Sequence, residues 1–246
     1  MRNVPSRKLT FFDQKSVWIK YEDETNRERI KKTITMIPQV SSILEIGCGS
    51  GLILNKLSSD LIVGIDLSRA ALNEIIHERI VGSGHMLPFK DFSFDMVILA
   101  EVLEHLNTKQ LEKTLEEVTR VARYYVLVSV PYREMPWETF VKCACCGNSY
   151  SPYGHQQFFD EDRIRGLIKS QYQRIEFCGM KKRLLSLKKI MQKFGIYNYR
   201  ENSICPFCGS KKLKYGIVEK IANNALRLIS KFAPSEPNWI LCLYKL

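Results

Sequence analysis

The sequence predicts an α/β fold, built as a doubly wound, mostly parallel sheet of seven strands with an antiparallel last strand and an inserted cap. Three observations support this prediction. Apolar runs of strand length alternate with helical patterns up to residue 131. Two further strand-like runs follow after residue 172, and the last of them would pair antiparallel at the end of the sheet. Two matching cysteine pairs lie outside these runs and indicate an added element.

Each element follows from its own local pattern. The region Phe11–Ile37 is expected to be helical, and the helix Lys109–Ala122 carries apolar residues at helical spacing that would cover one face of the sheet. Further helices are expected to begin at Gly51 and to cover Asp160–Ser170 and Ile217–Phe232. The expected strands, in chain order, are Ser42–Ile46, Leu61–Asp66, a short piece near Ile80–Gly84, Phe94–Ala100, Tyr124–Val130, Gln173–Cys178 and Asn238–Tyr244.

The first strand ends in a loop with three glycines at alternate positions, Gly47, Gly49 and Gly51. Because glycine has no Cβ, a ligand can press against the bare backbone of such a loop. A helix that starts directly afterwards points its free N–H groups at the same place. The loop therefore predicts a site for a nucleotide-like cofactor, with an ordinary tight turn as the alternative.

Two acids near this loop indicate which cofactor binds. Asp66 ends the second strand, where it can accept both hydroxyls of a ribose, although it can also cap the helical pattern that opens at Ser68. A pyrophosphate-binding loop would need a glycine at the position of Leu52. Glu45 precedes the loop, and it would repel a pyrophosphate but suits a ligand that carries an ammonium and a sulfonium. These features favour S-adenosylmethionine over NAD.

Four motifs, in this order, resemble the class I S-adenosylmethionine-dependent methyltransferases, and most closely the type 11 domain of the ubiquinone/menaquinone C-methylase kind. They are Glu45–Gly51, Asp66, the turn Leu87–Phe89 and Phe94–His105, within a match over roughly Ile34–Pro131. The resemblance implies a Rossmann-like fold, binding of S-adenosylmethionine and methyl transfer.

By this resemblance, the glycine loop holds the methionine part of the cofactor, Asp66 holds the ribose and the segment Ser83–Met86 flanks the adenine. The family often has an aspartate where this chain has Ser83, so the contact with the adenine amine departs from the pattern. Cys48 is common at its position in the family and is not expected to be a nucleophile. The expected cofactor-binding residues are Glu45, Gly47, Cys48, Gly49, Gly51, Asp66, Leu67, Ser83, His85, Met86, Ala100, Glu101 and His105.

The two cysteine pairs, Cys143–Gly147 and Cys205–Gly209, share the pattern C-x-x-C-G. Such a tight turn lets two sulfurs face one metal, and two such knuckles make the tetrahedral Cys₄ site of a zinc ribbon. A disulfide is disfavoured in a reducing compartment, and a redox C-x-x-C normally heads a helix in a thioredoxin-like unit. Cys145 is a spare thiol whose spacing is wrong for the site. We therefore expect a structural zinc on Cys143, Cys146, Cys205 and Cys208.

Length and charge bound the remaining possibilities. The 246 residues, 45% of them hydrophobic, suffice for one large domain with an embellishment. No apolar run is long enough to cross a bilayer, and the N-terminus lacks a signal-peptide core, so a cytoplasmic location is expected. The net charge of +11 suggests an acidic partner. The basic segment Lys181–Tyr199 can rest on an anionic membrane or on nucleic acid, or it can pack on its own domain.

The expected organisation has three parts. Residues 1–37 form an N-terminal helical lid, because a helix there commonly covers the cofactor in the resembled family; packing of Trp18 and Tyr21 on the sheet is the alternative. Residues 38–135 form the cofactor-binding half, and residues 136–246 form the remainder with cap insertions at 136–155 and 181–235. Both insertions follow strands at the carboxyl edge of the sheet, where ligands bind in open α/β folds, so we expect a substrate cap clipped by zinc.

The expected function is transfer of a methyl group to a small-molecule, glycan or lipid-linked acceptor, which can be anionic. Such a displacement mainly needs alignment, and it needs a base only if the acceptor is a hydroxyl or a carbon acid. His155 is the candidate base, with a metal ligand or a capping residue as its other possible roles. The segment Ala100–Leu103 lacks an N-P-P-Y-like tetrad, which weighs against methylation of the exocyclic amine of a base. An RNA or protein methyltransferase and a non-catalytic cofactor-binding protein are the alternatives.

Overall fold

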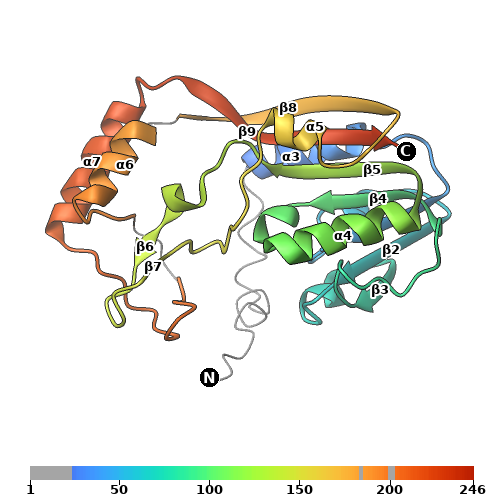
Figure 1. The fold of residues 1–246 in the computed structure, drawn as a ribbon, viewed down its shortest axis with the longest axis horizontal. Helices are drawn as coiled ribbons and strands as arrows, with labels where there is room; N and C mark the ends of the chain where they lie inside the picture. The colour runs from blue at the N-terminus through green and yellow to red at the C-terminus, as the bar shows by residue number, and fades with distance from the viewer. Residues whose placement is uncertain (1–23, 183–184, 199–202) are drawn as a thin grey trace.

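A computed structural model describes residues 24–182, 185–198 and 203–246 of the chain. Most of the predicted N-terminal lid, including Trp18 and Tyr21, lies outside these residues, and its described part is the helix α3 (Glu24–Thr35). The core of the molecule is a seven-stranded sheet with the order β3-β2-β1-β4-β5-β9-β8 (Figure 1). Its strands are β1 (Ser42–Ile46), β2 (Leu61–Asp66), β3 (Glu78–Val81), β4 (Phe94–Ala100), β5 (Ala122–Pro131), β8 (Tyr172–Lys182) and β9 (Ser235–Lys245).

The strand directions confirm the predicted topology. Neighbouring strands from β3 to β5 all pair in parallel, whereas β9 is antiparallel to both β5 and β8. Every residue of β4 is buried, as expected for a central strand that is covered on both faces. Val97 and Leu99 pack into one core cluster and Met96 and Ile98 into another, so the two clusters lie on opposite faces.

Helices close both faces of the sheet. The helix α4 (Thr108–Val121) packs Leu111 and Val118 into the first cluster, together with Ile164 of the short helix α5 (Glu161–Arg165). On the other face, α3 contributes Ile30 to the second cluster. The predicted doubly wound architecture is therefore confirmed.

The prediction of helices beside the glycine loop is wrong. Between β1 and β2 the chain forms only a 3₁₀ turn, Leu54–Lys56, and between β2 and β3 only another, Ala71–Glu74. The connection 47–60 is short, and the glycine loop takes its first part, so one turn remains before the chain must return to the sheet. The basic segment also differs, because its first residues Lys181 and Lys182 belong to β8 and only Leu185–Lys193 is helical, as α6.

The cap consists of the hairpin β6 (Val141–Lys142) and β7 (Ser149–Tyr150) and of the helices α6 and α7 (Ile217–Ser230). These elements lie together at one end of the molecule (Figure 1, left). The pairing of β5 with β9 ends at Trp239, but β8 and β9 continue to pair as far as Lys182 and Ser235. The last two strands thus project beyond the sheet as a ribbon, and α6 and α7 are attached at its end.

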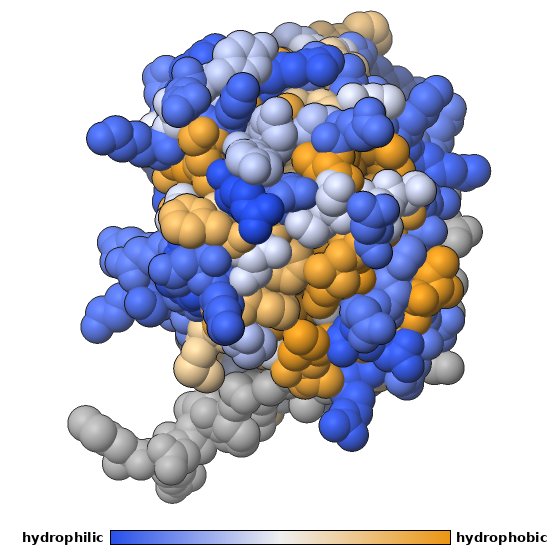
Figure 2. Space-filling view, turned by 90° about the vertical axis from the view of Figure 1, so that its right-hand side faces the viewer, coloured by the Kyte–Doolittle hydropathy of each residue, from blue (hydrophilic) through white to orange (hydrophobic). Residues whose placement is uncertain are grey.

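The opposite end of the molecule has an ordinary mixed surface. Figure 2 shows this end, where apolar side chains form separate groups between polar ones. Scattered apolar groups of this kind are normal on a protein surface. Within the described part of the chain, no helix is both long and apolar enough to cross a membrane.

Candidate functional site

The glycine loop has a backbone that only glycine adopts readily. Gly47, Gly49 and Gly51 have φ values of 68°, 53° and 81°, all in the left-handed region. A Cβ atom built on Gly47 would overlap with Cγ2 of Val102. The turn between β1 and the 3₁₀ segment is therefore specified by both conformation and space.

Asp66 ties this loop to the end of β2. Its Oδ2 accepts a hydrogen bond from the N–H of Gly49 at 2.9 Å, and its Oδ1 accepts one from the N–H of Ser68 at 2.8 Å. Asp66 does not cap the next turn, which begins at Ala71; the N–H of Ala71 donates instead to the hydroxyl of Ser68 at 3.2 Å. Asp66 thus lies beside the glycine loop, where the ribose was predicted to bind. Its neighbour Leu67 exposes 54% of its surface.

Glu45 is buried beneath the loop. Only 3% of its surface is exposed, and no described residue donates a hydrogen bond to its Oε2. Removal from water raises the pKa of this carboxyl to about 8, although the nearby Arg29 and the backbone N–H of Leu54 partly oppose that shift. A buried acid with an unfilled oxygen is suited to a cationic ligand, which would stabilise its ionised form.

Arg29 of α3 is a site residue that the sequence analysis missed. It is 4% exposed, and its guanidinium lies 5.6 Å from the centre of the Trp239 ring. Its Nε and Nη1 find no acceptor within residues 24–182, 185–198 and 203–246. A buried guanidinium with unfilled donors fits a carboxylate ligand. It could not be recognised from the sequence, because it lies in a basic run that is typical of a solvated helix, namely Arg27, Arg29, Lys31 and Lys32.

Glu101 follows β4 in a strained conformation, with φ of 60°. Its N–H donates to the carbonyl of Ser129 at 2.9 Å, and its Oε2 accepts a hydrogen bond from Nε1 of Trp239 at 2.9 Å. Desolvation raises the pKa of the Glu101 carboxyl, whereas the Arg29 charge lowers it. Glu45, Arg29 and Glu101 therefore form one group of ionisable side chains near the carboxyl ends of β1 and β4, in which Glu45 and Arg29 are buried.

Two other predicted residues, Cys48 and Ala100, are core residues at the edge of this group. Both are buried, with 5% and 9% of their surface exposed. Desolvation raises the pKa of the Cys48 thiol far above its usual range, and the Glu45 and Asp66 charges add to that effect. The thiol is therefore neutral, which agrees with the expectation that it is no nucleophile.

The predicted adenine-flanking segment forms a tight turn. The hydroxyl of Ser83 lies 2.6 Å from Nδ1 of His85, Met86 is 76% exposed, and the N–H of Met86 donates to the carbonyl of Ser83. The position where an aspartate is common thus carries a Ser–His pair in this chain.

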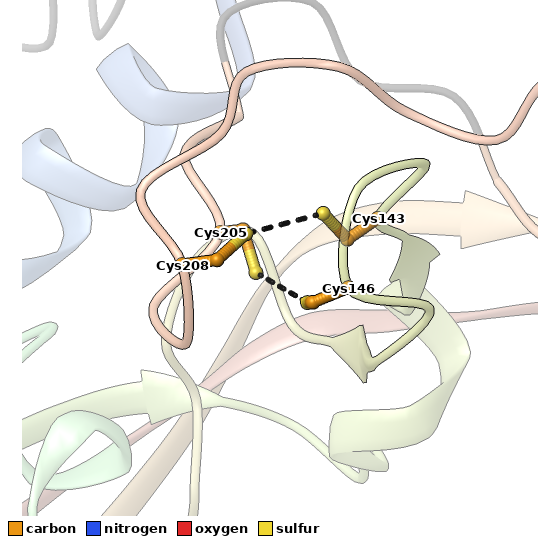
Figure 3. Close-up of side chains that lie close together, drawn as sticks. All are labelled: Cys143, Cys146, Cys205 and Cys208. Atoms are coloured by element: carbon orange, nitrogen blue, oxygen red, sulfur yellow. Dashed lines mark hydrogen bonds between the residues drawn. The ribbon is translucent and has the colours of Figure 1, made fainter.

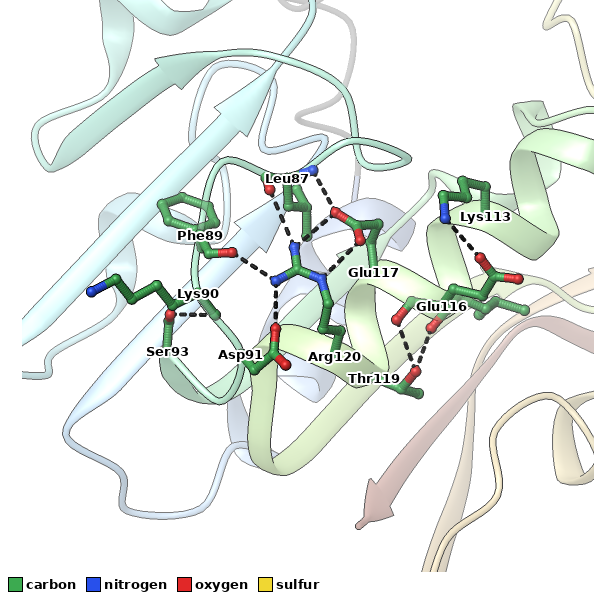
Figure 4. A network of polar contacts seen from close by, with 11 residues as sticks. Leu87, Phe89, Lys90, Asp91, Ser93, Lys113, Glu116, Glu117, Thr119 and Arg120 are labelled. Atoms are coloured by element: carbon green, nitrogen blue, oxygen red, sulfur yellow. Dashed lines mark hydrogen bonds and ion pairs between the residues drawn. The ribbon is translucent and has the colours of Figure 1, made fainter.

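The following Leu-Pro-Phe turn is fixed to α4 by one arginine (Figure 4). Arg120 donates hydrogen bonds to the carbonyls of Leu87 and Phe89 and pairs with Glu117 and Asp91. The Arg120 hydrogen bonds hold the pKa of Glu117 down to about 2, and Glu117 also accepts the N–H of Leu87 at 2.7 Å. This network positions the segment before Leu87 relative to the sheet.

His155 lies in the loop after β7 and pairs with a carboxylate. Its Nδ1 is 2.7 Å from Oε1 of Glu134, which follows β5. Its ring also contacts the ring of His105, with centroids 4.8 Å apart, and that of Tyr153 at 5.5 Å. The loop is held in place because the N–H groups of the next two residues donate to the carbonyl of Glu104. Glu134 was not predicted, since it is distant from His155 in the sequence.

Glu104 completes this group. It is 1% exposed, and neither carboxylate oxygen has a hydrogen-bond partner among the residues that the structure places. Desolvation, reinforced by the neighbouring Glu101, raises the pKa of Glu104 well above its usual value. One ligand atom each from Glu104, His105 and His155 lie within 4.8 Å of one another, so these residues could also hold a metal ion. From the sequence we interpreted Glu104 as a solvated helix residue, and this interpretation is wrong, because the residue is buried in a 3₁₀ turn.

The four paired cysteines meet in the cap (Figure 3). The Sγ atoms of Cys143 and Cys208 lie 3.6 Å apart, and those of Cys146 and Cys205 lie 3.5 Å apart. All four sulfurs are within 4.8 Å of one another. A tetrahedral zinc with Zn–S distances of about 2.3 Å places its sulfurs about 3.8 Å apart, so the four residues fit this metal. Cys145 is exposed and lies outside the cluster.

Backbone contacts hold the two knuckles together and favour thiolates in the first of them. The N–H of Ala144 donates to the carbonyl of Lys212, and that of Lys214 donates to the carbonyl of Lys142. The backbone N–H of Cys146 is the main cause that lowers the pKa of the Cys143 thiol. The long insert between the knuckles thus returns to the starting point, which sequence spacing alone does not reveal.

Comparison with known proteins places residues 44–125 in the family described as a methyltransferase domain. A tRNA (carboxymethyluridine(34)-5-O)-methyltransferase from Arabidopsis thaliana is 30% identical over 108 residues, which make up 42% of this chain and 27% of that protein. An uncharacterized protein from Methanocaldococcus jannaschii is 34% identical over 107 residues, or 42% of this chain and 40% of its own length. The chain therefore covers well under two thirds of these curated relatives.

Solved structures share the fold over nearly the whole chain. A SAM-dependent methyltransferase from Thermotoga maritima, described as a possible histamine N-methyltransferase, has a TM-score of 0.57 and 14% identity and covers 96% of both chains. The N-methyltransferase NodS from Bradyrhizobium japonicum, in complex with S-adenosyl-L-homocysteine, has the same TM-score and identity and covers 97% of this chain and 96% of its own. At sequence identities this low, the structural similarity establishes the fold alone.

Proposed function

We propose that this chain acts as a class I S-adenosylmethionine-dependent methyltransferase and transfers a methyl group to a small-molecule, glycan or lipid-linked acceptor. Residues 44–125 match the family described as a methyltransferase domain, and solved methyltransferases share the fold. The observation that carries this proposal is the placement of two acids and one arginine around the glycine loop. Asp66 binds the loop from β2, Glu45 lies buried beneath it, and Arg29 faces Glu45 with unfilled donors.

Each of these groups matches one part of the cofactor. Asp66 would accept hydrogen bonds from the ribose hydroxyls, because each carboxylate oxygen has a second lone pair beside the one that binds a backbone N–H. Arg29 would bind the carboxylate of the methionine part, and Glu45 would face its ammonium or its sulfonium. Ser83 and His85 would contact the adenine in place of the usual aspartate. These roles would give partners to Nε and Nη1 of Arg29 and to Oε2 of Glu45, which are buried and have no hydrogen-bond partner among the described residues.

When bound, S-adenosylmethionine would supply a methyl group attached to a sulfonium, and the sulfonium becomes a neutral thioether once the methyl group is transferred. The chain has to align the acceptor, exclude water and, for a hydroxyl acceptor, take up one proton. Glu134 holds Nδ1 of His155, which leaves Nε2 as the atom that accepts this proton. The position of this pair after β5 and β7, at the side of the sheet that bears Glu101, supports His155 as the general base.

We further propose that one zinc joins the four cysteines and that its role is structural. Four thiolates fill the tetrahedral coordination and leave no open position for substrate. The zinc would fasten the hairpin β6–β7 to the chain that leads into α7, and so would stabilise the cap beside the acceptor site.

A second acceptor class, RNA, is favoured by two observations. The net charge is +11, and one curated relative of part of the chain is a tRNA methyltransferase. Phosphate-driven binding would weaken steeply with added salt. Absence of RNA binding at low salt would dismiss this class.

Methyl-labelled S-adenosylmethionine, incubated with the protein and separate metabolite, lipid and RNA fractions of a cell extract, tests the activity. Label in the metabolite or lipid fraction supports the proposal, and label in RNA alone supports the second class. At limiting S-adenosylmethionine, Asp66→Asn should reduce labelling, whereas Asp60→Asn, which changes an exposed acid at the other end of β2, should not. Calorimetry without any binding of S-adenosylmethionine would overturn the proposal.

Once an acceptor is known, His155→Asn should lower kcat by about a hundredfold or more and leave the Kd of the cofactor nearly unchanged. Glu134→Gln should have a smaller effect in the same direction, because it removes only the group that orients the ring. His77→Asn, in a half-buried histidine before β3, is the matched control. An unchanged kcat in His155→Asn would exclude this histidine as the base.

A further inference from the structure

The helix α7 turns a continuous apolar face to the solvent. Its exposed apolar residues recur every three or four positions and therefore lie along one side of the helix. Ile217 is 78% exposed, Ile221 64% and Leu228 60%, and Phe232 just after the helix is 92% exposed. We call this face the apolar stripe; it consists of Ile217, Val218, Ile221, Ala225, Leu228, Ile229 and Phe232.

The opposite side of α7 holds the helix to the protein. Leu226 is only 8% exposed, and the side chain of Asn223 donates to the carbonyl of Tyr197 at 3.0 Å. The inner side thus sets the orientation of α7, and the apolar stripe points away from the other residues that the structure describes. An apolar surface of this extent on a protein normally binds another surface.

Cations border the apolar stripe. Lys220, Arg227 and the C-cap residue Lys231 are exposed and occupy the adjacent side of α7, at spacings of seven and four residues. The neighbouring α6 adds exposed Lys189 and Lys193, together with Ile190 and Phe194, which are 49% and 80% exposed. The end of the cap therefore combines apolar side chains with a fringe of positive charge.

We propose that α7 docks this face of the cap onto an anionic lipid bilayer, lying in the plane of the membrane with the apolar stripe among the acyl chains. Charge complementarity selects this partner. A second copy of the chain would bring the same cations together, and RNA would pair with the cations but leave the apolar stripe in water. A bilayer with anionic headgroups accepts both features at once. The inference is independent of the proposed activity.

Sedimentation with vesicles tests the proposal on the purified full chain. Wild type should bind vesicles with about 30% phosphatidylserine in phosphatidylcholine far more tightly than pure phosphatidylcholine vesicles, and added salt should weaken the binding. The triple variant Ile221→Ser, Leu228→Ser, Phe232→Ser should lose at least about a hundredfold in vesicle affinity. Because all three side chains are exposed, the variant should keep its circular dichroism spectrum and melting temperature.

Two further variants separate the contributions. Exchange of Lys220, Arg227 and Lys231 for Gln should lower the affinity for the anionic vesicles about a hundredfold, at about fivefold per cation. The weak binding to pure phosphatidylcholine vesicles should stay unchanged. Ile76→Ser with Tyr172→Ser, which removes side chains that are 74% and 57% exposed elsewhere, is the matched control and should bind like wild type.

Three results would overturn the proposal. The first is a wild-type protein that ignores anionic vesicles, and the second is an apolar triple variant that binds them as well as wild type. The third is light scattering that shows a dimer which the apolar triple variant loses, because the stripe would then join two copies. Binding of single-stranded RNA that depends on the cations alone, without vesicle binding, would point to RNA instead.

Discussion

Glu45 is expected to lose a proton when S-adenosylmethionine binds, so that cofactor affinity rises with pH. Burial raises the pKa of this carboxyl to about 8, and the uncharged form therefore predominates at neutral pH. A bound ammonium or sulfonium stabilises the carboxylate form. Because only the ionised acid attracts the cation, binding must first remove the proton.

The size of the effect follows from the pKa. At about pH 7 roughly one tenth of Glu45 is ionised, so proton removal costs about 1.4 kcal/mol of binding free energy. Between about pH 5.5 and about pH 7.5 the ionised fraction rises about 75-fold, and the Kd should fall by the same factor. Above this range the α-amino group of the cofactor itself begins to lose its proton, which ends the useful window.

Isothermal titration calorimetry at about pH 6.5 in buffers of different ionisation enthalpy measures the proton directly. Wild type should release about one proton per cofactor bound, whereas Glu45→Gln should release none and show a Kd that is flat with pH. Glu74→Gln, in an exposed acid of the 3₁₀ turn after β2, should behave like wild type. A wild-type protein with a flat Kd and no proton release would refute the reasoning, since Glu45 would then already be ionised or would not face the cation.

The raised pKa of Glu45 also affects the stability of the protein without cofactor, which should fall as the pH rises, because the acid ionises more readily in the unfolded chain. The stability that the protonated Glu45 contributes is fully present below the pKa of 4.5 that this carboxyl has in the unfolded chain. It is lost as the pH rises toward the folded-state pKa of about 8. At about pH 7 the loss amounts to roughly 3 kcal/mol. Glu45→Gln should therefore melt at a higher temperature than wild type near pH 8 and at a similar temperature near pH 4.

Three other predictions concern the remaining parts of the site. Asp66→Ala should weaken cofactor binding about 10- to 100-fold in calorimetry, since it removes a charged acceptor, and an unchanged Kd would contradict the ribose assignment. Cys205→Ser should reduce zinc from about one equivalent per chain to nearly none by elemental analysis, whereas Cys145→Ser should retain it; metal-free wild type would disprove the zinc site. Gly47→Ala should lower the free energy of unfolding by about 2 kcal/mol or more in denaturant melts, because strain and a steric clash add. Gly195 has a similar φ, but a Cβ atom there would meet open space. An equal loss of unfolding free energy in Gly195→Ala would therefore show that the clash is not the cause.

The sheet could be predicted because its signal is local. The strands β1, β2 and β4 begin and end at the residues that their apolar runs indicated. The carboxyl ends of parallel strands meet at one edge, so Glu45 and Asp66 could be placed near each other from the sequence alone. The cysteine pairs were equally local, since each knuckle carries its own turn and its own glycine.

The partners of these residues could not be predicted, because they depend on long-range packing. Arg29 enters the site only because α3 packs against β8, far away in the sequence, where Glu28 accepts the N–H of Gly179. Glu134 reaches His155 only because the loop after β7 is bonded to Glu104. Such contacts join segments that no periodicity or spacing relates.

The direction in which an amphipathic helix faces is a further property that sequence periodicity leaves open. The helices α4 and α7 each have 14 residues, and in both the apolar residues recur at helical spacing and gather on one side. In α4 the apolar side packs on the sheet, so Val118 is fully buried, whereas the corresponding side of α7 leaves Ile221 64% exposed. The cause is the ribbon of β8 and β9, which continues past the end of their neighbour β5 and carries α7 beyond the sheet that could have covered it. An amphipathic pattern therefore supports the core in one helix and, by our proposal, binding to a membrane in the other.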